Sequence, residues 1–109
     1  MPKRRAPRDS VDDVLHALAD PSRRRIVERL IRSPASVSEL AAPLPMSLPA
    51  VHQHLRVLEA SGLIASEKVG RVRTCRVEPA ALAPVERWVI AQRSTWEQRL
   101  DRLGEYLGE

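Results

Sequence analysis

The sequence has almost no aromatic residues. Phenylalanine is absent, and the aromatic side chains are Trp88, Trp96 and Tyr106, all in the last quarter of the chain. Hydrophobic residues make up 43% of the 109 residues, so the chain has the size of one domain with a thin core. A domain this small gains buried surface by pairing with a second copy.

Cysteine is nearly absent too, since Cys75 is the single one. One cysteine excludes an intrachain disulfide framework and fits a reducing compartment, so we expect a cytoplasmic protein. No apolar run reaches the length of a membrane span, and nothing resembles a signal peptide, so we expect no membrane partner. Neighbouring cations could make Cys75 a redox sensor. The other interpretation, which we prefer, is a structural cysteine turned inward.

The chain also lacks the residue groups that catalysis or metal binding requires. Its three histidines are scattered, and it has no nucleophile–base–acid set and no glycine-rich phosphate loop. A transition metal needs a cluster of thiolate or imidazole ligands, and the sequence offers none. We therefore expect no enzymatic activity, no bound metal and no cofactor.

Positive charge is abundant and is concentrated in the first part of the chain. Residues 1–76 hold 14 Lys or Arg against 8 Asp or Glu, a net charge of +6, whereas residues 77–109 hold 4 against 6, a net charge of −2. A basic region indicates a polyanionic partner, so the first part is the candidate DNA-facing part. Residues 1–9 are predicted to be a disordered basic arm ahead of one domain at 10–109.

Hydrophobic spacing predicts a mainly helical fold with one β-hairpin. In chain order, the expected helices begin at Ser10, Pro21, Ser36, Ser47 and Pro79, and the expected strands cover residues 64–69 and 72–77. Ser10 is expected to cap the first helix, and Ser36 with Glu39 forms a capping-box pattern. The order α-α-α-α-β-β-α is that of a winged helix-turn-helix.

The helix predicted at 47–61 has two distinct faces. Val51, Leu55 and Leu58 recur at helical spacing and should face the core. The side chains that then point away are Pro49, His52, Gln53 and Arg56. Gln and Arg can make bidentate contacts to adenine or guanine edges, and His can contact base or phosphate. Ser47 and the helix N-terminus suit a phosphate. The alternative is an ordinary solvated polar face, and His54 is expected at the core margin.

The hairpin and the start of the second helix both carry clustered cations. Lys68, Arg71, Arg73 and Arg76 fall within nine residues of the hairpin, where they can reach phosphates or a minor groove. The alternative is an edge hairpin kept soluble by charge. The second cluster is Arg23, Arg24 and Arg25, which cannot share one helical face. We expect some of these arginines to pair with the carboxylates of Asp20 or Glu28, and one of them to contact the backbone.

The last helix carries one apolar stripe along its whole length. The stripe consists of Val85, Val89, Gln92, Trp96, Leu100, Leu103 and Leu107, which step by three or four residues. A helix this long exceeds what a small domain can cover, so we predict a homodimer. The first helix, through Val14 and Leu15, is the second surface expected to pair. The alternative is that the stripe packs only on its own domain.

With these features, the chain resembles ArsR-type winged-helix repressors. The resemblance lies in residues 18–27 (LADPSRRRIV), 38–41 (SELA) and 47–63 (SLPAVHQHLRVLEASGL). It implies a homodimeric transcriptional repressor that releases its operator on a signal. By residue matching, the DNA-reading positions would be Ser47, Pro49, Ala50, His52, Gln53 and Arg56, with Lys68, Arg71 and Arg73 on the wing. The family usually has a small hydroxyl residue where this chain has His52.

The departures from the family pattern concern the signal. Metal-sensing members carry a Cys-x-Cys motif near the third helix, where this chain has residues 39–44 (ELAAPL), and no histidine follows His54. The chain resembles instead a metal-free branch with two tryptophans in the last helix. A sequence-specific repressor is the function that the resemblance implies, and a non-specific architectural DNA binder is the alternative. The sequence does not identify the operator, the regulated genes or the effector.

Overall fold

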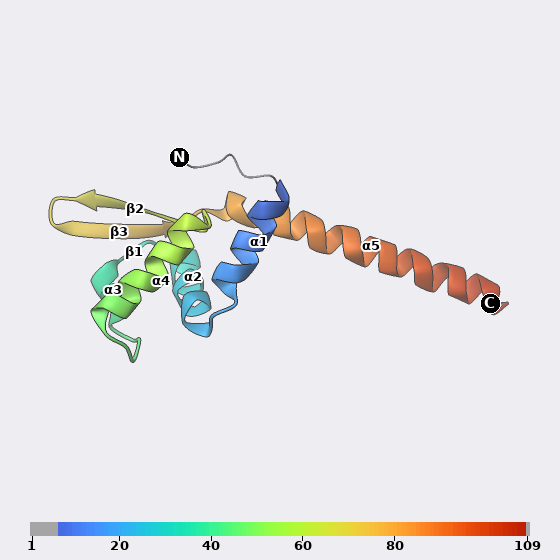
Figure 1. Ribbon diagram of the computed structural model, residues 1–109, viewed down its shortest axis with the longest axis horizontal. Helices are drawn as coiled ribbons and strands as arrows, with labels where there is room; N and C mark the ends of the chain where they lie inside the picture. The colour runs from blue at the N-terminus through green and yellow to red at the C-terminus, as the bar shows by residue number, and fades with distance from the viewer. Residues whose placement is uncertain (1–6, 109) are drawn as a thin grey trace.

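The computed structural model describes residues 7–108, with side chains from Ser10 onward, and it has the predicted winged helix-turn-helix order. Its elements are α1 (Pro7–Leu18), α2 (Pro21–Arg32), β1 (Ala35–Ser36), α3 (Val37–Ala41), α4 (Leu48–Ala60), β2 (Ile64–Val69), β3 (Val72–Val77), the 3-10 helix η1 (Pro79–Leu82) and α5 (Ala83–Tyr106). The first four helices and a small three-stranded sheet form one body, and α5 extends away from it (Figure 1).

The first helix begins earlier than the sequence pattern predicts. α1 starts at Pro7, so Ser10 lies inside the helix and the prediction that it caps the helix is wrong. Proline suits a first helical position, because its fixed φ is helical and an N–H there would have no intrahelical partner. Of the predicted disordered arm, residues 1–6 lie outside the described residues.

The corner between α1 and α2 is held by Asp20 and the arginines that follow it. The Asp20 carboxylate accepts from the backbone N–H groups of Ser22 at 2.8 Å and Arg23 at 3.1 Å, which caps α2. Arg23 Nε donates to the carbonyl of Ala17 at 2.7 Å, and Arg24 donates to that of Leu18 at 2.7 Å. Two of the three consecutive arginines therefore satisfy carbonyls at the end of α1.

The sheet has three antiparallel strands in the order β1-β3-β2, one more than the sequence predicted. β1 is only two residues long and pairs Ala35 with Cys75. Such a short strand shows no alternation of polar and apolar residues, so the pattern could not reveal it. β2 and β3 form the predicted hairpin, and its turn contains Gly70 at φ +63°, a left-handed conformation that favours glycine.

The core lies where α1, α2, α3, α4 and the base of the sheet meet. Its fully buried large side chains are Val14, Ile26, Leu30, Val51, Leu58, Leu63 and Cys75. Val14 is only 1% exposed because it points into this core, so the prediction that it lies in a dimer interface is wrong. Leu15, the next residue along α1, stays 46% exposed and remains available to a partner.

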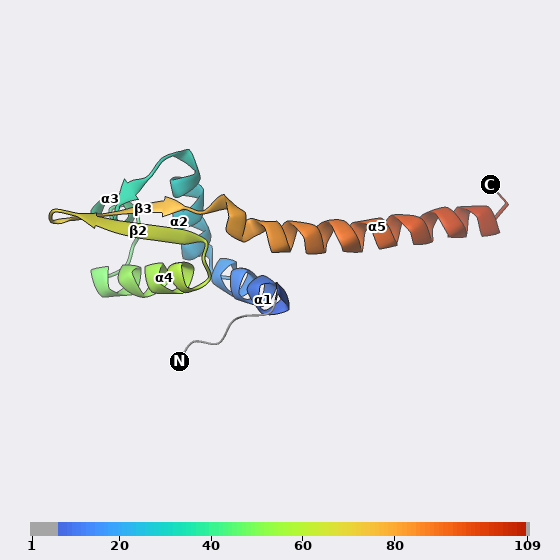
Figure 2. The ribbon, with the colours of Figure 1, turned by 90° about the horizontal axis from the view of Figure 1, so that it is seen from above.

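The molecule is elongated because α5 projects from the rest of the fold. The principal extents are 67 × 35 × 21 Å, and 24 helical residues span about 36 Å at 1.5 Å per residue. The last helix, predicted to begin at Pro79, starts with the separate 3-10 helix η1, and α5 follows it and packs against α1. The wing and the free end of α5 lie at opposite ends of the molecule (Figures 1 and 2).

Candidate nucleic-acid interface

Helix α4 is fixed at its N-terminus and along one face, which determines what it presents to solvent. Ser47 is its N-cap, and the Ser47 hydroxyl accepts from the backbone N–H of Ala50 at 3.3 Å. Val51, Leu55 and Leu58 are buried, as their spacing predicted. Packing of these three side chains prevents rotation of the helix, so its opposite face is presented in one orientation.

The outward face of α4 carries the polar residues that were expected to read DNA. Ser47, Pro49, Gln53 and Arg56 are exposed, while Ala50 and His52 are partly buried. Arg56 donates from Nη2 to Oε1 of Gln53 at 2.7 Å, so these two side chains are joined before any partner arrives. The six predicted positions therefore lie at the N-cap and in the first and middle turns of α4, and among them Pro49, Gln53 and Arg56 are the exposed ones within the helix.

The hairpin stands beside α4 and is tied to it by hydrogen bonds. The Ser66 hydroxyl on β2 donates to the Glu59 carboxylate on α4 at 2.6 Å. Arg73 on β3 donates to the same hydroxyl at 2.9 Å. Sequence reasoning missed Glu59 and Ser66 because each is an ordinary polar residue and they are seven positions apart. The three residues fix the position of the wing relative to α4.

A groove of about 380 Å³ separates the wing from the beginning of α3 and α4. Its lining residues are Ser36, Val37, Ser38, Leu48, His52, Lys68, Arg71, Val72 and Arg73. Three of these are cations and three others, Ser36, Ser38 and His52, can form hydrogen bonds. Viewed from above, the hairpin lies between α3 and α4 (Figure 2). Such a positively charged channel matches a phosphate backbone, since Lys and Arg supply most non-specific affinity for DNA.

Two other basic residues have roles in the fold. Arg76, at the base of the hairpin, forms an ion pair with Glu78 at 3.0 Å and does not line the groove. Arg23 Nη1 lies 3.2 Å from Nδ1 of His54. Because a guanidinium only donates, Nδ1 of His54 is the acceptor in this contact. His54 is partly buried, as its expected place at the core margin requires.

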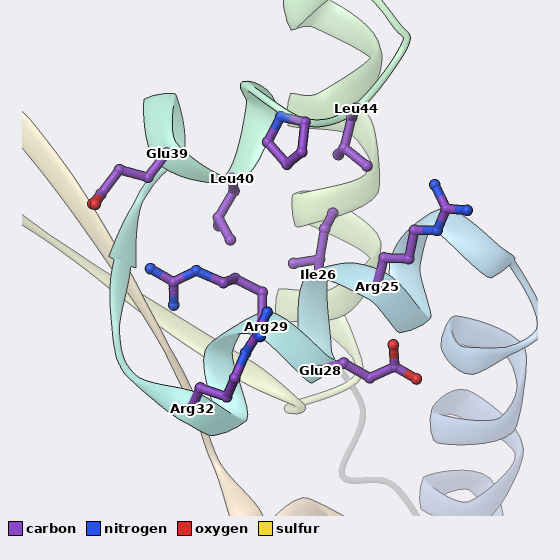
Figure 3. A pocket seen from close by; sticks show the side chains of 9 residues that line it. Arg25, Ile26, Glu28, Arg29, Arg32, Glu39, Leu40 and Leu44 are labelled. Atoms are coloured by element: carbon purple, nitrogen blue, oxygen red, sulfur yellow. The ribbon is translucent and has the colours of Figure 1, made fainter.

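A second cavity of about 270 Å³ lies between α2 and α3. Its apolar side is formed by Ile26, Leu40, Pro43 and Leu44, and its charged rim by Arg25, Glu28, Arg29, Arg32 and Glu39 (Figure 3). Arg29 donates to the Ser33 carbonyl at 2.9 Å, and Glu39 accepts from the Ser36 N–H at 2.8 Å. Arg29 and Glu39 therefore serve helix ends, and none of the residues that line this cavity also lines the groove beside the wing.

Cys75 is buried and faces the core rather than the DNA side of the wing. Burial raises the pKa of its thiol, the nearby Glu59 carboxylate raises it further, and Arg73 opposes them. The reactive form of cysteine is the thiolate, which this environment disfavours. The structural interpretation of Cys75 therefore has the better support.

Helix α5 exposes a large apolar surface beyond the point where it leaves α1. Trp96 is 57% exposed and Leu103 is 52% exposed. Val89, Leu100 and Leu107 of the predicted stripe are also exposed, whereas Val85 packs partly against its own core. Trp88 and Tyr106 add to this surface, although the stripe did not include them.

Residues 7–108 lack two features that mark other classes of protein. No group of three or more His, Cys, Asp or Glu in this range could hold a metal ion. No helix in the same range combines the length and apolar character that crossing a membrane requires.

The geometry of α4, the turn before it and the basic hairpin defines a DNA-binding winged helix-turn-helix protein, and known proteins share this arrangement. The helix-turn-helix domain family matches residues 18–67. The HTH-type transcriptional regulator Rv2034 of Mycobacterium tuberculosis is 47% identical over 74 residues, which cover 68% of this chain and 69% of that protein. The transcriptional repressor SmtB of the same species is 38% identical over 77 residues, 71% of this chain and 57% of that protein.

Solved structures extend the similarity to most of the fold. The ArsR family transcriptional regulator RHA00566 is 44% identical with a TM-score of 0.79, covering 87% of this chain and 97% of that one. An ArsR-like transcriptional regulator from Rhodococcus sp. RHA1 is 35% identical with a TM-score of 0.77, covering 90% and 92%. The chain belongs to the ArsR family of winged helix-turn-helix transcriptional regulators. It is therefore a transcriptional regulator with a DNA-binding domain and not an enzyme.

Proposed function

We propose that the protein is a homodimeric repressor that binds an inverted-repeat operator through residues 47–61 and the wing at 64–77. The observation that carries this proposal is the fixed position of the wing beside α4, through the contacts of Ser66 with Glu59 and Arg73. The wing and the outward face of α4 therefore meet one DNA duplex together. α4 enters the major groove, and Lys68, Arg71 and Arg73 bind the flanking backbone.

The exposed surface of α5 supports the homodimer. Trp96, Leu100 and Leu103 would leave a long apolar surface in water if the chain were a monomer, and such surfaces mark interaction sites. Leu15 on α1 adds to this surface at the start of α5. In a dimer with a twofold axis through α5, we expect the two recognition helices to lie about one DNA turn apart, roughly 10 base pairs centre to centre.

The proposed function includes repression of transcription and its relief by a signal. The relative SmtB is named a transcriptional repressor, which supports repression by this chain. We propose that the signal is not a transition metal, because the third helix and α5 lack the thiolates and imidazoles that such a metal needs. A chelator should then leave DNA binding unchanged.

Selection from a randomised duplex library with the purified protein tests the proposed function. The proposal predicts enrichment of one inverted repeat whose half-sites are about 10 base pairs apart. Footprinting on genomic DNA should then place that repeat over a promoter. Binding without an enriched sequence would instead support the architectural DNA binder, which the basic groove alone could explain.

A further inference from the structure

The contact between Gln53 and Arg56 changes which DNA bases each side chain can recognise. The two residues are three positions apart on α4, are both exposed, and are joined by the 2.7 Å hydrogen bond from Arg56 Nη2 to Gln53 Oε1. A guanidinium has five N–H donors and no acceptor, so the amide oxygen of Gln53 must be the atom that faces it. The amide NH₂ of Gln53 therefore points away from Arg56, and this group can only donate hydrogen bonds.

Arg56 keeps its capacity for bidentate binding in this arrangement. Each of the two hydrogens on Nη2 belongs to one edge of the planar guanidinium, one shared with Nε and the other with Nη1. Gln53 occupies one of these hydrogens, and the remaining edge stays complete. That edge matches O6 and N7 of guanine, which are both acceptors in the major groove.

Gln53, in contrast, is less suited to its usual partner. Bidentate recognition of adenine requires the amide oxygen to accept from the adenine N6 amino group while the amide NH₂ donates to N7. The oxygen already accepts from a cation, and a second donor would approach beside that positive charge. Glu59, the one carboxylate on α4, accepts from Ser66 at 2.6 Å, whereas Arg56 donates to Gln53.

We propose that Gln53 and Arg56 act as one reading unit that selects guanine in each operator half-site. Arg56 makes the base contact, and Gln53 is the positioning residue that holds the guanidinium across the face of α4. The unit presents only donors to the groove, so it favours the acceptor edge of guanine and disfavours adenine at the same position. This inference rests on the proposed function.

The test uses the operator obtained by selection and compares variants of Gln53. Fluorescence anisotropy gives the affinity for that operator and for versions with adenine or 7-deazaguanine at each half-site guanine. Gln53→Met keeps the length of the side chain but removes the acceptor. Gln53→Glu keeps an acceptor oxygen for Arg56. Arg93→Ala, in the exposed Arg93–Glu97 pair of α5, is a control away from the DNA face, and circular dichroism checks that each variant is folded.

One guanine per half-site should respond as follows. The wild-type protein and Arg93→Ala lose about tenfold or more in affinity when that guanine is replaced, as expected for a bidentate contact. Gln53→Met and Arg56→Ala each reduce this loss to about twofold or less, well below the discrimination of a bidentate contact. Gln53→Glu binds all DNA more weakly but retains the preference for guanine. In the double variant Gln53→Met/Arg56→Ala, the preference for guanine over its replacements should be no smaller than in Arg56→Ala alone.

Two results would overturn the reading unit and leave the proposed function intact. One is an operator whose guanines are all insensitive to Arg56→Ala. The other is full guanine preference in Gln53→Met, which would show that Arg56 reads without help. Failure to enrich any operator contradicts the proposed function itself, so the two failures are distinguishable.

Discussion

At the scale of single residues, Cys75 shows how burial decides chemistry. The cations near it in the sequence would suit a reactive thiolate, but the side chain is fully buried. Arg73, the cation that acts on it, donates a hydrogen bond to Ser66, and the burial of the thiol outweighs its charge. The sequence left two interpretations open, and the direction of the side chain favours one of them.

We predict that Cys75 reacts slowly with a thiol reagent in the folded protein. Because burial raises the pKa of the thiol, the thiolate forms only at a pH above the ordinary range for cysteine. The alkylation rate at neutral pH should be at least about tenfold below that of the protein unfolded in denaturant. Equal rates in the two states, or release of operator DNA on mild oxidation, would contradict the structural role.

Asp20 provides a prediction about acid stability. Hydrogen bonds from the backbone N–H groups of Arg23 and Ser22 lower the pKa of its carboxyl group. The ionised cap therefore stabilises the fold above the unfolded-state pKa, and this contribution disappears as the pH falls through the lower folded-state pKa. Asp20→Asn keeps a capping side chain that does not titrate.

Thermal melting of the wild type and Asp20→Asn as a function of pH checks this point. The melting temperatures of the two proteins should converge as the pH falls below about 4, the unperturbed range of aspartate. Asp20→Ala should melt lower than both at neutral pH because the helix loses its cap. A constant difference between wild type and Asp20→Asn at every pH would show that the Asp20 charge does not matter.

At the scale of elements, the wing should contribute affinity for any DNA sequence, whereas the recognition helix should contribute sequence preference. Arg71→Ala removes a cation from the groove without removing a base contact, so it should weaken operator and random DNA about equally. The slope of log K against log salt should become shallower by about one. Titrations at several salt concentrations give both quantities. A changed sequence preference in Arg71→Ala would mean that the wing reads bases.

The sequence predicted the elements where local chemistry determines them. Capping side chains at Ser36 and Ser47 and the apolar spacing of Val51, Leu55 and Leu58 each specify a helix within a few residues. β1 could not be predicted, because its pairing with Cys75 is set by the packing of α2 and α3 against the hairpin. The start of α1 at Pro7 could not be predicted, because Ser10 is a plausible cap and Pro7 lies in a basic, proline-bearing segment typical of a disordered arm.

The candidate site was partly predictable for the same reason. The periodicity of α4 separates outward from inward residues, so the sequence and the family pattern together predict six positions as candidates for reading DNA. The contacts between Gln53 and Arg56 and between Glu59 and Ser66 depend on side-chain rotamers and on the approach of the hairpin. Those are tertiary features that spacing along the chain does not specify.

At the scale of the whole molecule, the exposed apolar stripe on α5 is the surface that we propose for assembly. Because Val14 is in the core, the partner surface that we propose consists of Leu15 and the exposed side chains of α5. We predict that Trp96→Ala weakens the dimer by about 2 kcal/mol or more, because buried aromatic anchors dominate association energies. Operator affinity should fall with it, although the residue is far from the groove.

Sedimentation and a melting curve distinguish this effect from ordinary destabilisation. Gln98→Ala is the matched control, since two residues along a helix point to nearly opposite sides. The control should keep the dimer, whereas Trp96→Ala and Leu100→Asp should dissociate at micromolar concentration and still fold. A dimer that survives dilution in both of those variants would place the main interface elsewhere.

The most direct test of the account compares the affinity of the full-length protein for its selected operator and for a random duplex of equal length. The Kd values should be measured at several salt concentrations that include the physiological one. A sequence-specific regulator should bind the operator about a thousandfold or more tightly, and the ratio should persist as salt weakens both complexes. Affinities that stay within about tenfold of each other at every salt concentration would contradict the account, because the basic groove alone would explain them.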